Sequence, residues 1–457
     1  MERVDVAIVG GGPAGSSAAA TAAENGADAV VIEKGVPRAD RADLGPDSTD
    51  AAGMLDYWND IMDFDPDEIP DEVILQELDG ADFFGPSESV SIDTTGMSAT
   101  YDGFGYTFHR ARMDDWLRER AEDAGATYRV GDGVRDVETD LSGGHTHTLH
   151  LSNGDQIQSE YLILADGPQR QVTNRVLDRF MPAGESITDY LGTTRANHVA
   201  YQEHRRIPED VFEPARIQFW WGAIPGETAY PWIFPNDDPV ARVGLTMPIG
   251  MAIEDVENPT DYTLLRADDE RLPKPNEYLR RLLEREFGDE YDVEEDFPLV
   301  EDRGKAGGTE TYAISSTRPI DSPTRAGVAV TGGAMGTTSA FHEGGYHVAV
   351  RSGKIAGELA ARDRLTRYND AWKDAIGDEI LRNVSFAEIV RDFRPADWDR
   401  AFEATRRLLA PEGSEQLLRW QLSAGVEGLR QLVRYRWHKW NFRDGRYVQV
   451  PESDYTV

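Results

Sequence analysis

The sequence predicts an α/β fold, in which a three-layer domain is divided by an inserted antiparallel sheet and followed by a helical C-terminal region. Three observations indicate this fold. A strand–turn–helix–strand unit opens the chain at residues 4–33, and a second glycine-rich strand–loop–helix unit follows at 327–362. Between them, residues 190–250 are mostly strand-forming and rich in aromatic side chains.

The first unit begins with the apolar run at residues 4–9 and passes through a glycine turn into an alanine-rich helix that ends at Gly26. A second apolar run, residues 29–32, ends on Glu33. Strand, glycine turn, helix, strand and acid, in this order, are typical of a dinucleotide-binding βαβ unit. We therefore predict a bound adenine dinucleotide at this end of the chain.

Each glycine of the turn has a role in this interpretation. Gly10 permits the tight turn, Gly12 lets the backbone approach a pyrophosphate, and Gly15 lets the helix pack close to the strand. The pyrophosphate would accept hydrogen bonds from the free N–H groups at the helix N-terminus. A carboxylate at Glu33 can accept from a ribose hydroxyl and disfavours a 2′-phosphate, so NADP is not expected here. The predicted cofactor contacts of this unit are Gly10, Gly12, Pro13, Ala14, Gly15, Glu33 and Lys34.

The composition is strongly acidic. The 457 residues are enough for two or three domains, and their formal net charge is −36. Only 6 of the 47 basic residues are lysines. This pattern predicts a halophilic protein, because concentrated salt screens the self-repulsion of the acidic chain; the alternative is an ordinary acidic enzyme. The overall field repels nucleic acid and anionic membrane, and we expect no nucleic-acid partner.

Cysteine is absent. Disulfides, thiolate zinc sites, cysteine-ligated iron–sulfur clusters and dithiol flavoenzymes are therefore excluded. The first strand starts too early for a signal peptide, and no apolar run is long enough to span a membrane, so we expect a cytoplasmic protein. His145 and His147 would share one strand face, but an exposed hairpin edge is favoured over a metal site, and no metal is predicted.

Between the two glycine units the chain alternates between loops and regular elements. Residues 35–100 read as loops and short elements over the cofactor, and the acidic loop 37–50 either lines a site or is simply solvated. Residues 109–128 form a helix ended by Gly125. A hairpin at 145–158 and a buried strand at 162–165 follow.

The aromatic residues of 190–250 suit either the wall of a large apolar pocket or the core of a sheet. A helix is expected near 276–287. The second glycine unit has a strand at 327–331, a glycine loop, and a helix that starts at Gly344-Gly345. One nicotinamide site would not need this unit, whereas FAD needs one unit for the adenosine and another beside the flavin.

We therefore expect an FAD-binding Rossmann-like three-layer domain with an inserted antiparallel-sheet substrate domain. The predicted ranges are 1–189 and 300–362 for the FAD-binding domain, 190–299 for the substrate domain, and 363–457 for the helical C-terminal region. Residues 418–446 contain seven basic and two acidic residues together with tryptophans. This segment could make peripheral membrane contact, dock a partner, or pack on its own acidic domain.

The two glycine units and the motifs between them resemble the para-hydroxybenzoate-hydroxylase-like FAD superfamily and, within it, the geranylgeranyl reductase family. The resemblance covers most of the chain to about residue 390. It implies that Arg110 approaches the FAD phosphates, that Val134 meets the adenine through its backbone, and that Asp166-Gly167 faces the pyrophosphate. It further implies that Gly345 opens the helix beside the flavin. The segment 230–235 (YPWIFP) is similar to the Tyr-x-Trp-x-Phe-Pro substrate segment of the reductases, which marks Tyr230, Trp232 and Phe234 as substrate contacts.

Two positions depart from the family pattern. The third FAD motif of the family reads Gly-Asp-Ala, and here Gly333 stands at the position of the aspartate that bonds the ribityl chain. Relatives also carry a Cys-Gly pair beside the flavin, where this chain has Leu44-Gly45-Pro46-Asp47. The first departure predicts that FAD is held differently, held more weakly or lost, and the second predicts a changed substrate or a changed reaction.

The resemblance implies a reductase for C=C bonds of geranylgeranyl-type lipids or precursors, as in archaeal ether lipids, with NAD(P)H, ferredoxin or quinol as electron donor. His342 and then Asp47 are the candidate proton donors. Three alternatives stay open: a flavin monooxygenase or hydroxylase, a non-redox cyclase or isomerase that uses flavin, and a binding protein that has lost FAD.

Overall fold

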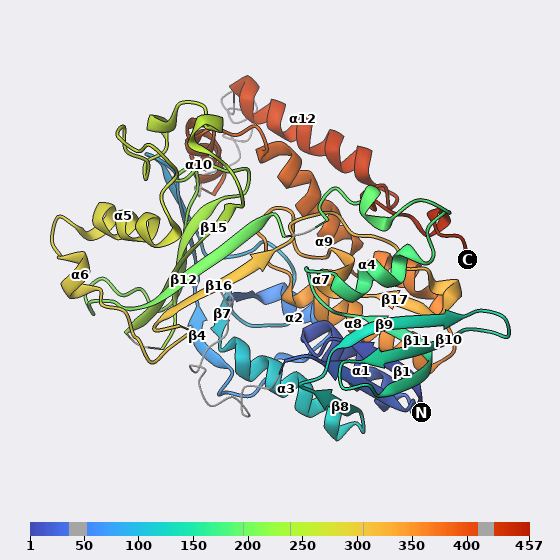
Figure 1. The fold of residues 1–457 in the computed structure, drawn as a ribbon. Helices are drawn as coiled ribbons and strands as arrows, with labels where there is room; N and C mark the ends of the chain where they lie inside the picture. Colours follow the sequence, from blue (N-terminus) through green and yellow to red (C-terminus); the bar gives the residue numbers. More distant parts are fainter. Residues whose placement is uncertain (36–52, 195, 238, 305, 410–424) are drawn as a thin grey trace.

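The computed structural model describes residues 1–35, 53–194, 196–237, 239–304, 306–409 and 425–457. The predicted α/β class is confirmed. Figure 1 shows one sheet beside helices α1 and α8 and a second sheet that stands apart from it. The predicted acidic loop 37–50, and with it Asp47, lies outside the described residues.

The first sheet has the strand order β8–β2–β1–β11–β10–β9, and β17 also pairs with β11. Its strands are β1 (Glu2–Val9), β2 (Ala29–Glu33), β8 (Thr127–Val130), β9 (Val134–Asp140), β10 (Thr146–Leu151), β11 (Gln156–Leu164) and β17 (Val328–Val330). Strand β11 pairs with different strands along its length. Its first half pairs with β10 in the hairpin, and its second half pairs in parallel with β17. The second glycine unit is thereby placed beside the first one.

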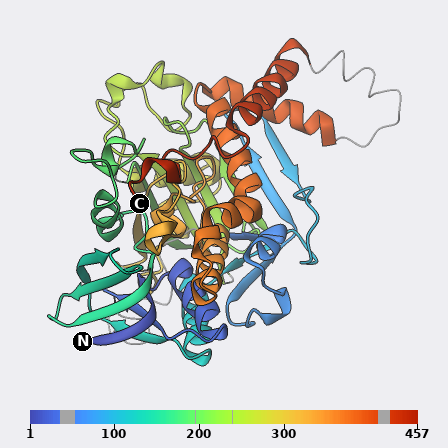
Figure 2. The same cartoon turned by 90° about the vertical axis from the view of Figure 1, so that its right-hand side faces the viewer.

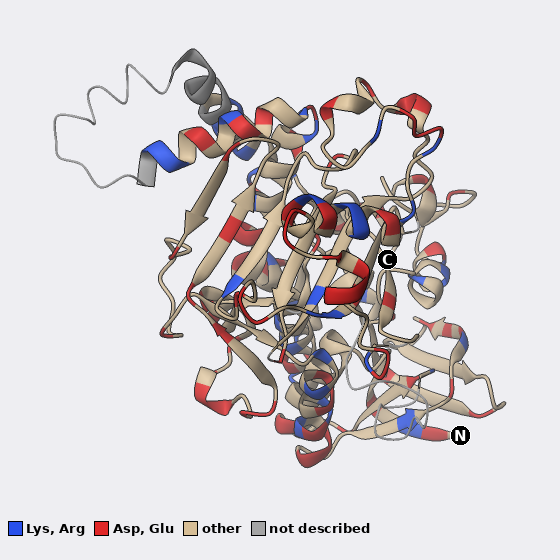
Figure 3. Cartoon of the chain, turned by 90° about the vertical axis from the view of Figure 1, so that its left-hand side faces the viewer, with Lys and Arg blue, Asp and Glu red and all other residues tan. Residues whose placement is uncertain are grey.

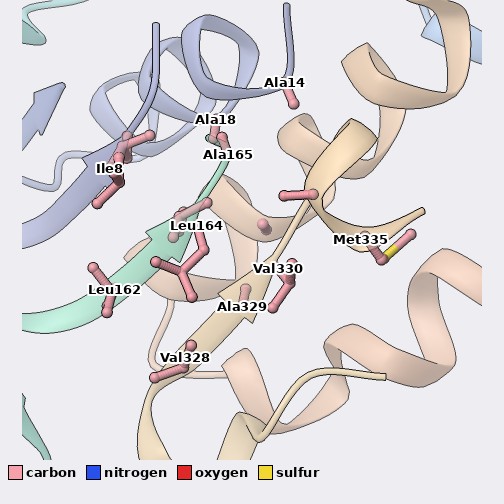
Figure 4. Close-up of a cluster of buried hydrophobic side chains, with 14 of the residues drawn as sticks. Ile8, Ala14, Ala18, Leu162, Leu164, Ala165, Val328, Ala329, Val330 and Met335 are labelled. Atoms are coloured by element: carbon pink, nitrogen blue, oxygen red, sulfur yellow. The ribbon is translucent and has the colours of Figure 1, made fainter. Parts of the chain in front are cut away.

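Two helices lie back to back on this sheet, α1 (Pro13–Glu24) and α8 (Tyr346–Ala361). Side chains at Gly353 and Gly357 would put Cβ 2.1 Å from the carbonyl oxygens of Ala14 and Ala18. The two backbones therefore touch, which brings the N-terminal halves of both helices to the same region. Alanines such as Ala14 and Ala18 lie at this contact, and larger aliphatic side chains such as Leu162, Leu164 and Val330 lie on the strands beneath it (Figure 4).

The second sheet has the order β16–β12–β15–β14–β13–β5–β6. Its strands are β5 (Gly80–Phe84), β6 (Ser89–Ile92), β12 (His198–Arg206), β13 (Arg216–Trp220), β14 (Tyr230–Pro235), β15 (Val240–Pro248) and β16 (Thr309–Ile314). All its pairs are antiparallel except β13–β5. Strands β5 and β6 come from a stretch where loops and short elements were expected. The domain ranges given above stay a prediction.

A third, small sheet joins the other two. It consists of β3 (Gly53–Leu55), β7 (Gly105–Phe108) and β4 (Ile74–Leu78), in that order. The remaining helices of the two main domains are α2 (Asp56–Met62), α3 (Arg110–Asp123), α4 (Gln171–Asp178), α5 (Pro275–Phe287), α6 (Val293–Asp296) and α7 (Gly332–Met335).

The hairpin histidines differ from the expectation of an exposed edge. His147 is fully buried, and its Nδ1 lies 3.0 Å from Thr139 Oγ1. Burial lowers the pKa of His147 to about 4, with the neighbouring His145 adding to the effect. The reason is that β10 lies between β9 and β11 and is not an edge strand, and that the backbone of Ala326 and Gly327 lies beside the His147 ring.

The C-terminal region is helical as predicted, with α9 (Tyr368–Val390), α10 (Pro395–Leu409) and α12 (Gly425–Phe442). In Figure 2, α12 lies against α9, and α10 lies beside the strand β6. The last residues return to the first domain, where Tyr447, Val450 and Tyr455 are buried in its core. No helix of the described residues is long and apolar enough to cross a membrane. Acidic residues are spread widely over the chain in Figure 3.

Candidate functional site

The first glycine turn is built from backbone that leaves no room for side chains. Gly10 has φ +103°, and a Cβ there would lie 2.3 Å from the Ala165 carbonyl oxygen. A Cβ at Gly15 would lie 1.9 Å from the Gly10 carbonyl oxygen. These contacts set α1 tightly against the ends of β1 and β11, as the glycine spacing predicts.

Gly12, the N-cap of α1, has room for a side chain. Among the described residues, no atom lies within 4 Å of the position that a Cβ would take there, and none of their side chains caps the helix. The first N–H groups of α1 therefore have no side-chain partner in that part of the chain, and the first turn holds no acidic residue. Free N–H groups at a helix N-terminus bind anions such as a pyrophosphate.

Glu33 closes this end of the site from β2. Its Oε2 accepts from the Gly11 N–H at 2.7 Å, and its Oε1 accepts from the Gly35 N–H. The carboxylate is thus fixed beside the turn, where a ribose would reach it, whereas Lys34 is exposed. Val134 begins β9 nearby, since a Cβ at the preceding Gly133 would lie 3.7 Å from Lys34 Cβ.

Arg110 lies at the other end of the site, beside the start of α8. Its Nε donates to Asp114 Oδ1 at 2.9 Å, and its guanidinium lies over the Tyr346 ring at 4.6 Å. The Tyr346 hydroxyl donates to the same Asp114 oxygen at 3.0 Å. The second predicted motif therefore meets the second glycine unit at the first residue of α8.

The Asp166 carboxylate is engaged in capping α4. Its Oδ2 accepts from the N–H groups of Val172 at 2.6 Å and Thr173 at 3.2 Å, and the Thr173 hydroxyl donates to its Oδ1. Its backbone lies against the first turn, because a Cβ at Gly10 would be 3.2 Å from Asp166 Cα. The Asp-Gly pair thus lines the site through its backbone.

The second glycine loop lies against the same pair. A Cβ at Gly333 would be 3.2 Å from the ring of Pro168, which follows Asp166-Gly167. Gly345 is the N-cap of α8, which has no side-chain cap either. Beneath the loop, the fully buried Arg170 donates from Nε to the Ala334 carbonyl at 2.8 Å, and burial lowers its pKa to about 10.

These features fit FAD. The uncapped N-terminus of α1 and the open space at Gly12 suit the pyrophosphate, and Glu33 offers a carboxylate to the adenosine ribose. The uncapped N-terminus of α8 suits the flavin, whose reduced form is anionic. Gly333 supplies no acceptor for the ribityl chain, so the second loop would hold FAD through backbone alone.

The predicted substrate residues share one face of β14. Tyr230, Trp232 and Phe234 are all buried in one aromatic cluster, together with Trp221 and Phe341. The next side chain on the opposite face, Ile233, packs into a different cluster with helix α5. Tyr230 joins the two predicted sites, because its hydroxyl donates to the His342 carbonyl oxygen at 2.6 Å.

His342 lies in the loop between α7 and α8, as predicted. Its ring stacks on Trp58 at 5.3 Å, its Nδ1 accepts from the Gly344 N–H at 3.2 Å, and Asn383 lies 3.4 Å from its Nε2. Burial lowers the pKa of His342 to about 4, so the imidazole is neutral at pH 7. Its role as a proton donor stays a prediction, as does that of Asp47.

Several polar side chains around this loop were not singled out from the sequence. His347 stacks on Trp58 at 4.1 Å and lies 3.8 Å from Glu379 on α9. A small cavity behind the loop is lined by Thr337, Ser339, Gly344, His347, Glu379 and Asn383. Burial alone would raise the pKa of Glu379, but His347, Arg382 and His342 lower it to about 2.

Glu343, next to His342, is another side chain that was not singled out from the sequence. It is buried, its carboxyl accepts from the Thr228 hydroxyl at 2.8 Å and from the Thr246 hydroxyl, and it lies 3.6 Å from His198 Nε2. Sequence reasoning had no signal for it, because its partners are far away in the chain. Among the described residues, no group of three or more His, Asp or Glu side chains is arranged to hold a metal ion.

The chain has similarity to known flavoproteins over most of its length. The FAD binding domain family matches residues 5–84. Digeranylgeranylglycerophospholipid reductase 3 of Methanosphaera stadtmanae is 24% identical over 426 residues, which cover 88% of this chain and 91% of that protein. The corresponding reductase of Thermoplasma volcanium is 27% identical over 396 residues, or 84% and 86% of the two chains. Menaquinone reductase of Mycolicibacterium smegmatis is 27% identical over 404 residues, or 84% and 83%.

Solved structures share the fold. A geranylgeranyl bacteriochlorophyll reductase-like protein from Thermoplasma acidophilum superposes with a TM-score of 0.69 at 22% identity, covering 95% of this chain and all of that one. The flavin-dependent halogenase CndH, a myxobacterial protein, gives 0.57 at 15% identity, covering 99% of this chain and 100% of that one. The predicted FAD-binding fold and cofactor are thus confirmed, while the predicted contact residues are not tested by these matches.

Proposed function

We propose that this chain, an FAD-dependent oxidoreductase homologous to the geranylgeranyl reductases, reduces isolated C=C bonds in isoprenoid chains. The observation that carries the proposal is the hydrogen bond from Tyr230 to the His342 carbonyl. It joins the aromatic face of β14 directly to the loop that opens α8. The proposal places an apolar chain along that face, with one end toward this loop.

The reaction needs a hydride, a proton and a correctly placed alkene. Reduced FAD, when bound, supplies the hydride. An isolated alkene is a poor electrophile, so the chain must lower the barrier by positioning the C=C bond and by protonating its second carbon. The buried rings of Tyr230, Trp232 and Phe234 would position the chain and exclude water.

A single-turnover experiment without oxygen tests this proposal. The FAD-loaded chain, reduced with dithionite in molar salt, would be mixed with a geranylgeranyl glycerophospholipid. We expect flavin absorption to return and the lipid to gain two hydrogens for each flavin reoxidised. Reoxidation only after air is admitted, with an oxygen or halogen atom gained by the lipid, would favour a monooxygenase or halogenase, and an isomerised lipid without electron consumption would favour a cyclase.

We further propose that the outer face of α12 rests on a lipid surface that presents the substrate. Val433, Trp437 and Trp440 recur every three or four residues and are exposed by 56%, 54% and 52%. Arg436 and Lys439 are exposed on the same helix. The opposite face is used within the protein, since Tyr435 stacks on Phe386 of α9 at 4.9 Å. Exposed tryptophans flanked by cations suit the boundary of an anionic membrane.

Sedimentation with vesicles tests the membrane contact. We expect binding to vesicles that contain anionic lipid and loss of binding in the double variant W437S/W440S. Ile249→Ser is the matched control, because Ile249 is 54% exposed but lies beside β15. Equal binding of all three proteins would contradict the contact.

A further inference from the structure

We infer that the Glu343 carboxyl, and not the neighbouring imidazole, donates the proton to the substrate alkene. This inference rests on the proposed reduction. It starts from the direction of two consecutive side chains. His342 turns toward Trp58 on α2 and Asn383 on α9, away from the substrate sheet. Glu343 turns the other way, toward the strands that carry the aromatic face.

The backbone at Glu343 has φ +58°, in the left-handed region that residues with a side chain rarely adopt. Such a conformation costs free energy and persists where the surrounding contacts fix it. Here the contacts are three side chains of the substrate sheet and its preceding loop: Thr228, Thr246 and His198. The loop is therefore held in the one conformation that presents this carboxyl to the sheet.

All partners of the carboxyl are neutral. Within the described parts of the chain, no lysine or arginine forms an ion pair with Glu343, and both of its oxygens accept from threonine hydroxyls. The titratable groups that face it are His198 from β12 and Tyr230 from β14. Burial lowers the pKa of His198 to about 4 and raises that of Tyr230, so both are uncharged at pH 7.

In these surroundings a carboxyl keeps its proton up to a pH near neutrality. Burial raises the pKa of Glu343 to about 7, although the bonds from Thr246 and Thr228 oppose the rise. A general acid works best when its pKa lies near the working pH. The neutral imidazole of His342 is a far weaker acid, because it would have to give up its last ring proton.

The proposed step balances as follows. The O–H bond of Glu343 breaks, and its proton forms a C–H bond with one alkene carbon through the electron pair of the C=C bond. Bound FAD, reduced by two electrons, would supply the hydride for the C–H bond at the other carbon, so that the alkene becomes an alkane. The Glu343 carboxylate that remains is held by the Thr228 and Thr246 hydroxyls, and it regains a proton from water before the next turnover.

Kinetics of three variants of the FAD-loaded chain test the inference. Glu343→Gln should lower the single-turnover rate of alkene reduction at pH 7 by about 100-fold or more, whereas Glu343→Asp should restore part of it. FAD affinity and reduction by dithionite should be unchanged in both. The wild-type rate should fall above about pH 7, and the rate of Glu343→Gln should not depend on pH. The control variant His342→Gln should keep the pH profile of the wild type. The inference would be overturned if Glu343→Gln had full activity and the pH profile of the wild type.

An infrared measurement without substrate separates this inference from the proposed function. Between pH 6 and pH 8 the wild-type protein should lose the C=O stretch of a protonated carboxyl, as should His342→Gln, and Glu343→Gln should show no such change. Absence of the band in the wild type at pH 6 would overturn the inference even if alkenes are reduced. A normal band in a chain that reduces no alkene would overturn the proposed function, and with it the donor role.

Discussion

The two glycine loops of the candidate FAD site are built differently. The first, residues 10–15, makes its contacts mainly through backbone, with the Glu33 carboxylate and the Ser16 hydroxyl both bonded to the backbone of Gly11. The second, residues 332–345, carries His342 and Glu343, whose side chains reach α9 and the substrate sheet. A backbone-built loop serves a cofactor common to many enzymes, whereas a loop with side chains on both sides can differ from one enzyme to another.

The largest effect is expected from Gly15→Ala. Its Cβ would lie 1.9 Å from a backbone oxygen of Gly10, so α1 must separate from the turn. We expect a loss of unfolding free energy of about 3 kcal/mol or more, as for overpacked cores, and no bound flavin. Urea denaturation measures this loss. Gly143→Ala, with no atom within 4 Å and no strained φ, is the control and should be neutral.

Gly12→Ala separates cofactor binding from folding. Gly12 has φ −76° and open space around its Cβ position, so the apoprotein should be as stable as the wild type. The added methyl group would stand where the pyrophosphate approaches, and we expect about 100-fold weaker FAD binding, or about 2.7 kcal/mol. Unchanged FAD affinity in a fluorescence titration would mean that the pyrophosphate lies elsewhere.

In the second loop, Glu343 should make stability depend on pH. Its pKa is raised from 4.5 to about 7 in the folded chain, so its contribution is complete below pH 4.5 and is lost as the pH rises through 7. Between pH 5 and pH 8 the wild type should lose about 2 kcal/mol more than Glu343→Gln. Urea midpoints at the two pH values measure this difference, and parallel curves for the two proteins would contradict it.

The smallest effect concerns Gly333, which stands in the second loop at the position of the family's aspartate. Gly333→Asp would restore an acceptor for the ribityl chain, at the cost of a Cβ that lies 3.2 Å from Pro168. Gly333→Ala has the same Cβ and no acceptor, so it is the matched control. We expect Gly333→Asp to bind FAD about fivefold more tightly than Gly333→Ala, or about 1 kcal/mol. Equal affinities would show that the ribityl chain does not pass this position.

The same contrast explains what the sequence could predict. The first loop, its strands and α1 are local, and apolar runs, glycine spacing and Glu33 identify them within the first 33 residues. The pairing of β5 with β13 and the covering of His147 depend on strands far away in the chain, so no local pattern indicates them. Glu343 was missed for that reason: its partners Thr228 and Thr246 are 115 and 97 residues away.

The central claim is that both loops bind a single FAD, and titration of the flavin-free chain with FAD in molar potassium chloride tests it most directly. We predict saturation at one FAD per chain with quenching of flavin fluorescence and a yellow protein after gel filtration. A chain that stays colourless and leaves the fluorescence of added FAD unchanged would contradict the account.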